Sequence, residues 1–298
     1  MSEVFISAPA LQALQRSGAP VVTLAVWSDE THAQFPGVPV PQRPRIPGAI
    51  ATELGSDFAA PGGGLHGSRP LPAIAALQQR VREWGIADDS VVVVYDHDRA
   101  LQAARAWWVL RWAGIGRVLI LDGGFAAWTD AGLPHAGGVA GAAAATAPDS
   151  AVPGVARRPG NALLSPGHLP QLDAAGAAAL ARSGVLLDTR IRPNYEGGPT
   201  PDGEPARGHI PGAISTPAAD NLDSDGRFLA PDLLRRYLAD AGVRAAQPVG
   251  VYCGAGVSAA HTIAVLQSLG ITAPLYVGSW SAWSADPARP VARGPAPG

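Results

Sequence analysis

The sequence predicts an α/β protein with two tandem domains, each a mainly parallel β-sheet flanked by helices. Short apolar stretches rich in β-branched residues alternate with stretches whose apolar residues recur at helical spacing. This alternation is typical of a parallel sheet covered by helices. The motifs of the first half also recur, in the same order, in the second half. At 298 residues the chain is long enough for two domains that each bury a core.

The elements of the first half follow one another in a regular order. A short helix around Leu11 and Leu14 precedes Val21–Trp27, a candidate buried strand. Helical spacing over 74–84 then leads to Val91–Tyr95, a continuous run typical of a strand covered on both faces. The half closes with a helix, a strand and a glycine-containing turn, at 99–112, 118–121 and 123–128.

Three motifs of the first half have copies roughly 155 to 165 residues later, which indicates a duplicated domain. They are Ile-Pro-Gly-Ala-Ile at 46–50 and 210–214, a strand at 92–95 and 249–252, and a turn ending in Trp at 123–128 and 278–283. Between the copies the chain becomes rich in Ala, Gly and Pro, as linkers are. We expect an N-terminal domain over 1–133, a linker over 134–159 and a C-terminal domain over 160–298.

The only cysteine, Cys253, lies on a turn between the strand Val249–Tyr252 and the start of a helix. In that position its sulfur would face the first free amides of the helix. A ring of amides and the positive end of a helix dipole favour a sulfur anion, so we expect a nucleophile. We expect the backbone of the next five residues to form its cradle: Gly254, Ala255, Gly256, Val257 and Ser258. The alternative is a small buried hydrophobe, which the two glycines disfavour.

The segment Cys-Gly-Ala-Gly-Val-Ser at 253–258 resembles the active-site loop of the rhodanese-type sulfurtransferases, and most closely its 3-mercaptopyruvate version. The resemblance covers nearly the whole chain and implies two rhodanese-like domains. The N-terminal one would be catalytically silent, because Asp96 stands where the second half has Cys253. The resemblance implies a Cys253 persulfide, loaded from a small anionic donor and discharged to cyanide or a thiol. Gly254 and Ala255 replace two basic residues of the thiosulfate version, which favours 3-mercaptopyruvate over thiosulfate.

The resemblance also assigns supporting residues. Asp188 and Arg190 would form a structural ion pair beside the loop, with Glu196 and an architectural His209 on the same side. From the first half, Asp57 matches the aspartate of the proposed Asp-His-Ser relay of the mercaptopyruvate enzymes.

The chain departs from the family in its substrate-binding residues. Asn194 and Asp202 stand where two arginines are expected, Ala255 replaces the relay serine, and Arg69 lies near the place of the relay histidine. We expect a replacement guanidinium, able to bind a carboxylate or sulfonate, among three residues. These are Arg192, Arg207 and Arg69.

Composition limits the partners. A formal charge of −2 without a long basic run disfavours nucleic-acid binding, and no apolar run approaches the ~20 residues that span a bilayer. A single cysteine and the lack of a leader-like start favour the cytoplasm. Nothing in the sequence calls for a metal or an organic cofactor. We expect a monomer that meets a donor and a thiophilic acceptor, which could also be a protein.

Two other functions compete with sulfur-transfer catalysis. A phosphatase of the same fold needs a longer loop that ends in an arginine, and Ala259 at the sixth place after Cys253 disfavours it. The altered substrate-binding residues instead suggest a sulfur-carrier or regulatory module that acts with protein partners and has lost turnover of small donors.

Overall fold

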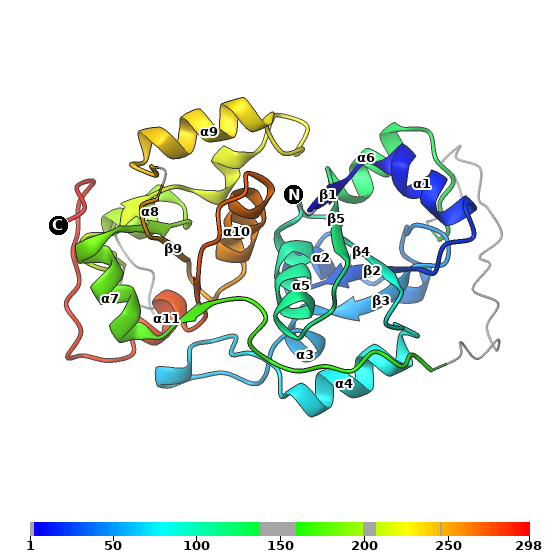
Figure 1. The fold of residues 1–298 in the computed structure, drawn as a ribbon, viewed down its shortest axis with the longest axis horizontal. Helices are drawn as coiled ribbons and strands as arrows, with labels where there is room; N and C mark the ends of the chain where they lie inside the picture. Colours follow the sequence, from blue (N-terminus) through cyan, green and yellow to red (C-terminus); the bar gives the residue numbers. More distant parts are fainter. Residues whose placement is uncertain (1–2, 138–158, 199–206, 245) are drawn as a thin grey trace. The chain divides into compact units, whose positions relative to one another are not determined.

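The computed structural model describes residues 3–137, 159–198, 207–244 and 246–298 (Figure 1). Their packing divides them into two compact units. The N-terminal unit consists of Glu3–Phe58 and Pro72–His168, and the C-terminal unit consists of Ala59–Leu71 and Leu169–Gly298. Each unit contains one five-stranded sheet with flanking helices. The expectation of two α/β domains is therefore confirmed.

The sheet of the N-terminal unit has the order β1-β5-β4-β2-β3, and its neighbours pair in parallel. Its strands are β1 (Phe5–Ile6), β2 (Val21–Trp27), β3 (Ile50–Glu53), β4 (Val91–Tyr95) and β5 (Val118–Leu121). The helices of this unit are α1 (Ala8–Arg16), α2 (Asp29–His32), α3 (Leu54–Asp57), α4 (Ile74–Glu83), α5 (Leu101–Trp112) and α6 (Gly124–Asp130), with the 3-10 helix η1 (Val40–Gln42).

The sheet of the C-terminal unit repeats this arrangement in the order β6-β10-β9-β7-β8, again with parallel neighbours. Its strands are β6 (Gln171–Leu172), β7 (Val185–Asp188), β8 (Ile214–Ser215), β9 (Val249–Tyr252) and β10 (Leu275–Tyr276). Its helices are α7 (Ala174–Ser183), α8 (Arg192–Glu196), α9 (Pro231–Asp240), α10 (Ser258–Ser268) and α11 (Ser279–Trp283), with the 3-10 helices η2 (Gly64–His66) and η3 (Ala218–Asn221).

Strand β4 shows why a continuous apolar run suits the centre of such a sheet. Val91, Val93 and Tyr95 join a core cluster that includes side chains of α1 and α6. Val92 and Val94 are equally buried, and successive side chains of a strand point to opposite faces. Both faces of the strand are thus covered, which explains a run without polar alternation.

Equivalent hydrogen bonds confirm the duplication. The Ile46 amide donates to the Tyr95 hydroxyl at 3.0 Å, and the Ile210 amide donates to the Tyr252 hydroxyl at 3.1 Å. In each unit a tyrosine at the end of the central strand therefore fixes the Ile-Pro-Gly turn. Trp128 of α6 and Trp283 of α11 likewise donate their indole N–H to a proline carbonyl, six and seven residues later.

The packing departs from the expected domain boundaries at two places. Residues 159–168, expected in part in the second domain, belong to the N-terminal unit, where the Gly160 amide donates to the Arg82 carbonyl at 2.8 Å and the His168 amide to the Trp112 carbonyl at 3.1 Å. Ala59–Leu71 belongs to the C-terminal unit although the first half supplies it. Most of the expected linker, 138–158, lies outside the described residues. Within the described ranges, no helix has the length and apolar character that crossing a membrane requires.

Candidate active site

Cys253 directly follows β9, the middle strand of its sheet, and α10 begins five residues later. All paired strands of this sheet are parallel, so the cysteine lies at the carboxyl edge, where open α/β sheets bind ligands. The side chain is almost fully buried. The local strand-turn-helix order is the one that the sequence predicts.

The cysteine loop, residues 253–258, supplies the expected amide to the sulfur. The Gly256 amide donates to Cys253 Sγ at 3.0 Å, and Gly256 has a φ of +76°, which favours glycine. The φ of Gly254 is not left-handed, and a Cβ there would meet no atom within 4 Å. Gly256 is thus required by the backbone, whereas Gly254 leaves open space beside the cysteine. Ala255, Val257 and Ser258 are half-buried in the same loop.

The start of α11 holds the cysteine loop from the other side. The Trp280 amide donates to the Cys253 carbonyl at 2.8 Å, and the Ser281 amide donates to the Gly254 carbonyl at 2.9 Å. The Ser279 hydroxyl accepts from the Cys253 amide at 3.2 Å and lies 4.0 Å from Sγ. Sequence reasoning did not single out Ser279 as a site residue. The duplication marks this position, because the two repeats differ there: Ser279 in the second half is equivalent to Gly124 in the first.

Asp188 and Arg190 form the expected ion pair, with 2.5 Å between Nη2 and Oδ2, and both side chains are buried. The Arg190 guanidinium also donates to the Gly208 carbonyl at 2.6 Å and lies 4.5 Å from the Trp280 ring centroid. Burial alone would lower the pKa of Arg190, but the charge and the hydrogen bonds of the Asp188 carboxylate outweigh burial and raise this pKa. The pair connects Asp188, at the end of β7, with Gly208, which precedes the Ile-Pro-Gly motif. Its contacts are therefore structural.

The predicted replacement arginines of the second half differ in their contacts. Arg192 forms a 2.6 Å ion pair with Asp220, and 57% of its side chain remains exposed. Hydrogen bonding to this carboxylate raises the pKa of Arg192. Asp220 also accepts from the Tyr237 hydroxyl at 3.3 Å. Arg207 is half-buried at the edge of the described ranges. The predicted position Asp202 lies outside the described residues.

The remaining candidates near α8 have mainly structural contacts. His209 is fully buried, stacks on Tyr195 at 3.8 Å and lies 2.9 Å from the Tyr195 carbonyl oxygen. These contacts agree with an architectural role. Asn194 accepts the Gly208 amide on its carbonyl, and the Glu196 carbonyl accepts the Gly294 amide. Both use backbone groups in these bonds, which hold the loops around α8.

Arg69 and Asp57 lie in different units. Arg69 is half-buried in the C-terminal unit, within Ala59–Leu71. Asp57 ends α3 in the N-terminal unit, accepts the Glu53 amide at 2.8 Å and pairs with Arg80 at 3.0 Å. Burial raises the pKa of Asp57, against the opposing effects of the Glu53 amide and of Arg80.

Asp96 occupies the place of the cysteine in the N-terminal unit. The Phe125 amide donates to its carbonyl at 3.0 Å, as Trp280 does to Cys253. Its carboxylate accepts the amides of Asp98, Ala100 and Ala103 at 2.8–2.9 Å. The first unit therefore keeps an anion-binding turn and fills it with its own carboxylate.

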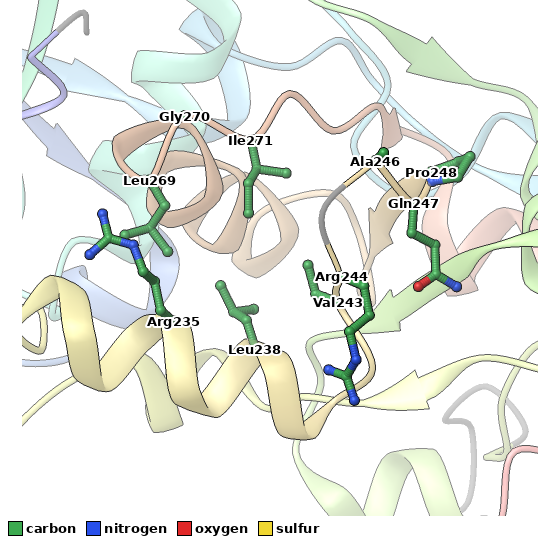
Figure 2. Close-up of a pocket in the computed structure, with 10 residues that line it drawn as sticks. All are labelled: Arg235, Leu238, Val243, Arg244, Ala246, Gln247, Pro248, Leu269, Gly270 and Ile271. Atoms are coloured by element: carbon green, nitrogen blue, oxygen red, sulfur yellow. The ribbon is translucent and has the colours of Figure 1, made fainter.

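A cavity of about 630 Å³ in the C-terminal unit lies away from the cysteine (Figure 2). Its apolar side chains, Leu238, Val243, Leu269 and Ile271, come from α9 and the segments after α9 and α10. Pro248, which also lines it, precedes β9, whereas Cys253 follows that strand. The cavity and the cysteine thus lie at opposite ends of β9. In the described part of the chain, no group of three or more acidic, His or Cys side chains could hold a metal ion.

Comparison with known proteins assigns the fold and the reaction class. The model of the rhodanese-like domain matches residues 32–131 and 173–286. A probable 3-mercaptopyruvate sulfurtransferase of Pseudomonas aeruginosa is 42% identical over 87% of both chains. A putative thiosulfate sulfurtransferase, SseB of Mycobacterium tuberculosis, is 39% identical over 99% of this chain and 98% of the relative.

Solved structures agree with this assignment. SseA from Escherichia coli, described as a 3-mercaptopyruvate sulfotransferase, superposes with a TM-score of 0.74 at 25% identity, over 94% of this chain and 100% of that one. Tum1 from Saccharomyces cerevisiae shares the fold, with a TM-score of 0.79 at 21% identity over 98% of each chain. The chain therefore belongs to the rhodanese family, as a sulfurtransferase with two rhodanese-like domains.

Proposed function

We propose that Cys253 carries the transferred sulfur as a persulfide. The observation that carries this proposal is the Gly256 amide, which donates to the buried Cys253 sulfur at the carboxyl edge of the sheet. An amide aimed at sulfur stabilises the thiolate that attacks and the anion of the persulfide that forms. Cys253 is also the only cysteine of the chain, so no second thiol competes for the role.

The reaction takes two displacements. The Cys253 thiolate attacks the sulfur of the donor and forms an S–S bond. With 3-mercaptopyruvate, the C–S bond breaks, its electron pair passes to carbon, and that carbon takes up a proton to give pyruvate. With thiosulfate, the S–S bond of the donor breaks and sulfite leaves with the electron pair. An acceptor such as cyanide or a thiol then attacks the outer sulfur and releases the Cys253 thiolate.

We favour 3-mercaptopyruvate as the donor, with thiosulfate second. The two residues after Cys253 are Gly254 and Ala255, so the loop lacks side-chain cations for a second sulfonate-like charge. The names of the relatives point in both directions, since the Pseudomonas relative is named for mercaptopyruvate and the Mycobacterium relatives for thiosulfate. Arg192, Arg207 and Arg69 are the proposed guanidinium donors for the carboxylate, and Asn194 and Asp57 are proposed to contact the substrate.

A second candidate is a sulfur carrier that serves protein partners without turning over small donors. The Arg192–Asp220 ion pair favours it, because a guanidinium already paired with a carboxylate is less available to an anionic donor. We further propose that the protein acts as a monomer in the cytoplasm, where a lone thiol stays reduced.

Intact mass spectrometry tests both candidates. The reduced protein is incubated separately with 3-mercaptopyruvate and with thiosulfate, and Cys253→Ser serves as the control. One added sulfur from 3-mercaptopyruvate, absent in the variant, is the expected result. Loading by both donors would remove the preference, and loading of Cys253→Ser would exclude the persulfide at this residue. If neither donor loads the protein, incubation with a persulfidated protein tests the carrier function.

A further inference from the structure

Ala59–Leu71, called the arm below, is a closed loop that the first half contributes to the C-terminal unit. The Ala60 amide donates to the Pro70 carbonyl at 3.0 Å, which closes the base of the arm. The Gly63 amide donates to the Gly67 carbonyl at 2.8 Å and closes its tip, around η2. The arm therefore has a defined shape of its own.

Gly67 brings the arm into close contact with the turn at the start of α11. It is buried and has a φ of +78°. A Cβ at this position would lie 2.6 Å from the Gly278 carbonyl oxygen and 3.1 Å from Ser281 Oγ. The next residue, Ser68, donates its amide to Ser281 Oγ at 2.9 Å. Only glycine allows this backbone-to-backbone approach, which is specific to the arm and α11.

Ser281 connects this contact to the cysteine loop. Its hydroxyl accepts from Ser68 and donates to the Gly278 carbonyl at 3.1 Å. Its own amide donates to the carbonyl of Gly254, the residue after Cys253, at 2.9 Å. One residue thus contacts both the arm and the cysteine loop. In the catalytically silent unit, the repeat register places Ala126 at this position, which has no hydroxyl.

We propose that the arm positions the cysteine loop through Ser281, so that the half without a catalytic cysteine takes part in the reaction at Cys253. Ser281 is a positioning residue in this proposal, since it contacts the loop and not the sulfur. The proposal rests on Cys253 as the sulfur carrier. The proposal explains why the arm packs with the C-terminal unit and why residue 67 is a glycine.

The first test compares two glycines of the arm that share a left-handed φ. Gly67→Ala forces the arm away from Gly278, whereas Gly64→Ala, at a φ of +51°, meets no atom within 4 Å. Iodoacetamide alkylation measures the reactivity of Cys253 without interference, because the chain has no other cysteine. We expect Gly67→Ala to change the alkylation rate, and the rate of single-turnover sulfur loading, by about threefold to tenfold. Gly64→Ala should stay within about twofold of the wild type.

The second test addresses Ser281 directly. Ser281→Ala removes the acceptor of the Ser68 amide but keeps the Ser281 amide that contacts Gly254. We expect Ser281→Ala to change the alkylation rate and the sulfur-loading rate in the same direction as Gly67→Ala. Ser281→Thr restores a hydroxyl, so both rates should return towards those of the wild type. Ser284→Ala, at the residue directly after the same helix, is the matched control. The pH profile of alkylation is recorded for each variant, because a purely structural weakening would not shift it.

The outcomes separate the two proposals. If the folded Gly67→Ala and Ser281→Ala variants both react at Cys253 like the wild type, the positioning proposal is wrong. Should Gly67→Ala fail to fold, Ser281→Ala and its threonine rescue decide alone. A wild-type protein that no donor loads would contradict the proposed function, whereas the alkylation comparison would still test the contact between the arm and the loop.

Discussion

The Ser279 hydroxyl accepts a hydrogen bond from the Cys253 amide and lies 4.0 Å from the Cys253 sulfur. Ser279 is fully buried and has a φ of +52°, a left-handed conformation that costs a non-glycine residue about 1–2 kcal/mol. The equivalent residue of the N-terminal unit, Gly124, has nearly the same φ of +57° without that strain. The C-terminal unit therefore keeps a strained residue where glycine fits, and gains a hydroxyl beside the cysteine.

Ser279→Gly should separate stability from activity. Relief of strain offsets the lost hydrogen bonds, so the free energy of unfolding should stay within about 1 kcal/mol of the wild type. Ser279→Ala retains the strain, loses the same bonds and should be the less stable variant. Both should load sulfur about threefold to tenfold more slowly in single-turnover experiments. Wild-type loading by Ser279→Gly would show that the hydroxyl serves folding alone.

The Asp188–Arg190 pair should matter mainly for stability. Asp188→Asn leaves a buried guanidinium without its carboxylate, which should lower the free energy of unfolding by about 3–5 kcal/mol. Asp232→Asn breaks the exposed pair with Arg235 and should cost less than about 1 kcal/mol. Denaturant unfolding of both variants measures the difference. If both variants lose the same free energy of unfolding, burial does not determine how much the Asp188–Arg190 pair contributes to stability.

Arg192 should affect donor binding if its guanidinium meets the donor carboxylate. Arg192→Ala should then raise the KM for 3-mercaptopyruvate severalfold and leave kcat nearly unchanged. Asp220→Asn, which releases the guanidinium, should lower KM instead. Arg236→Ala removes an exposed arginine of α9 and controls for net charge. An unchanged KM in both Arg192→Ala and Asp220→Asn would leave Arg192 as a surface ion pair.

The sequence predicted the local features of the site and missed the long-range ones. The strand, turn and helix around Cys253 follow from neighbouring residues, and the repeat register correctly paired Asp96 with Cys253. The Ser279 hydroxyl contacts the Cys253 amide although the two residues are 26 positions apart in the sequence. It does so from a strained turn that no local sequence pattern predicts. Chain order predicts that the arm belongs to the first domain, but packing assigns it to the C-terminal unit. The Arg192–Asp220 pair also joins distant residues, so composition gave no sign of it.

His97, next to Asp96, should make stability depend on pH. It stacks on Trp27 at 4.5 Å and lies 4.7 Å from the Phe125 ring, and burial, with a smaller effect of the Arg43 charge, lowers the pKa of His97 to about 4. Below the ordinary pKa of about 6.5 the unfolded chain binds a proton that the folded chain does not. Stability from this group is therefore complete above pH 6.5 and falls by about 3 kcal/mol as the pH approaches 4.

Asp96 should oppose this loss, and variants can separate the two groups. Burial raises the pKa of Asp96 to about 6, despite the amides that favour its charged form. The folded chain therefore takes up this proton first, and stability rises as the pH falls from 6 towards 4. His97→Phe should become more stable relative to the wild type on acidification, whereas Asp96→Asn should become less stable. Denaturant unfolding between pH 7 and 4, with the exposed His66→Phe as control, measures both slopes. Parallel slopes in all four proteins would show that neither buried group titrates in this range.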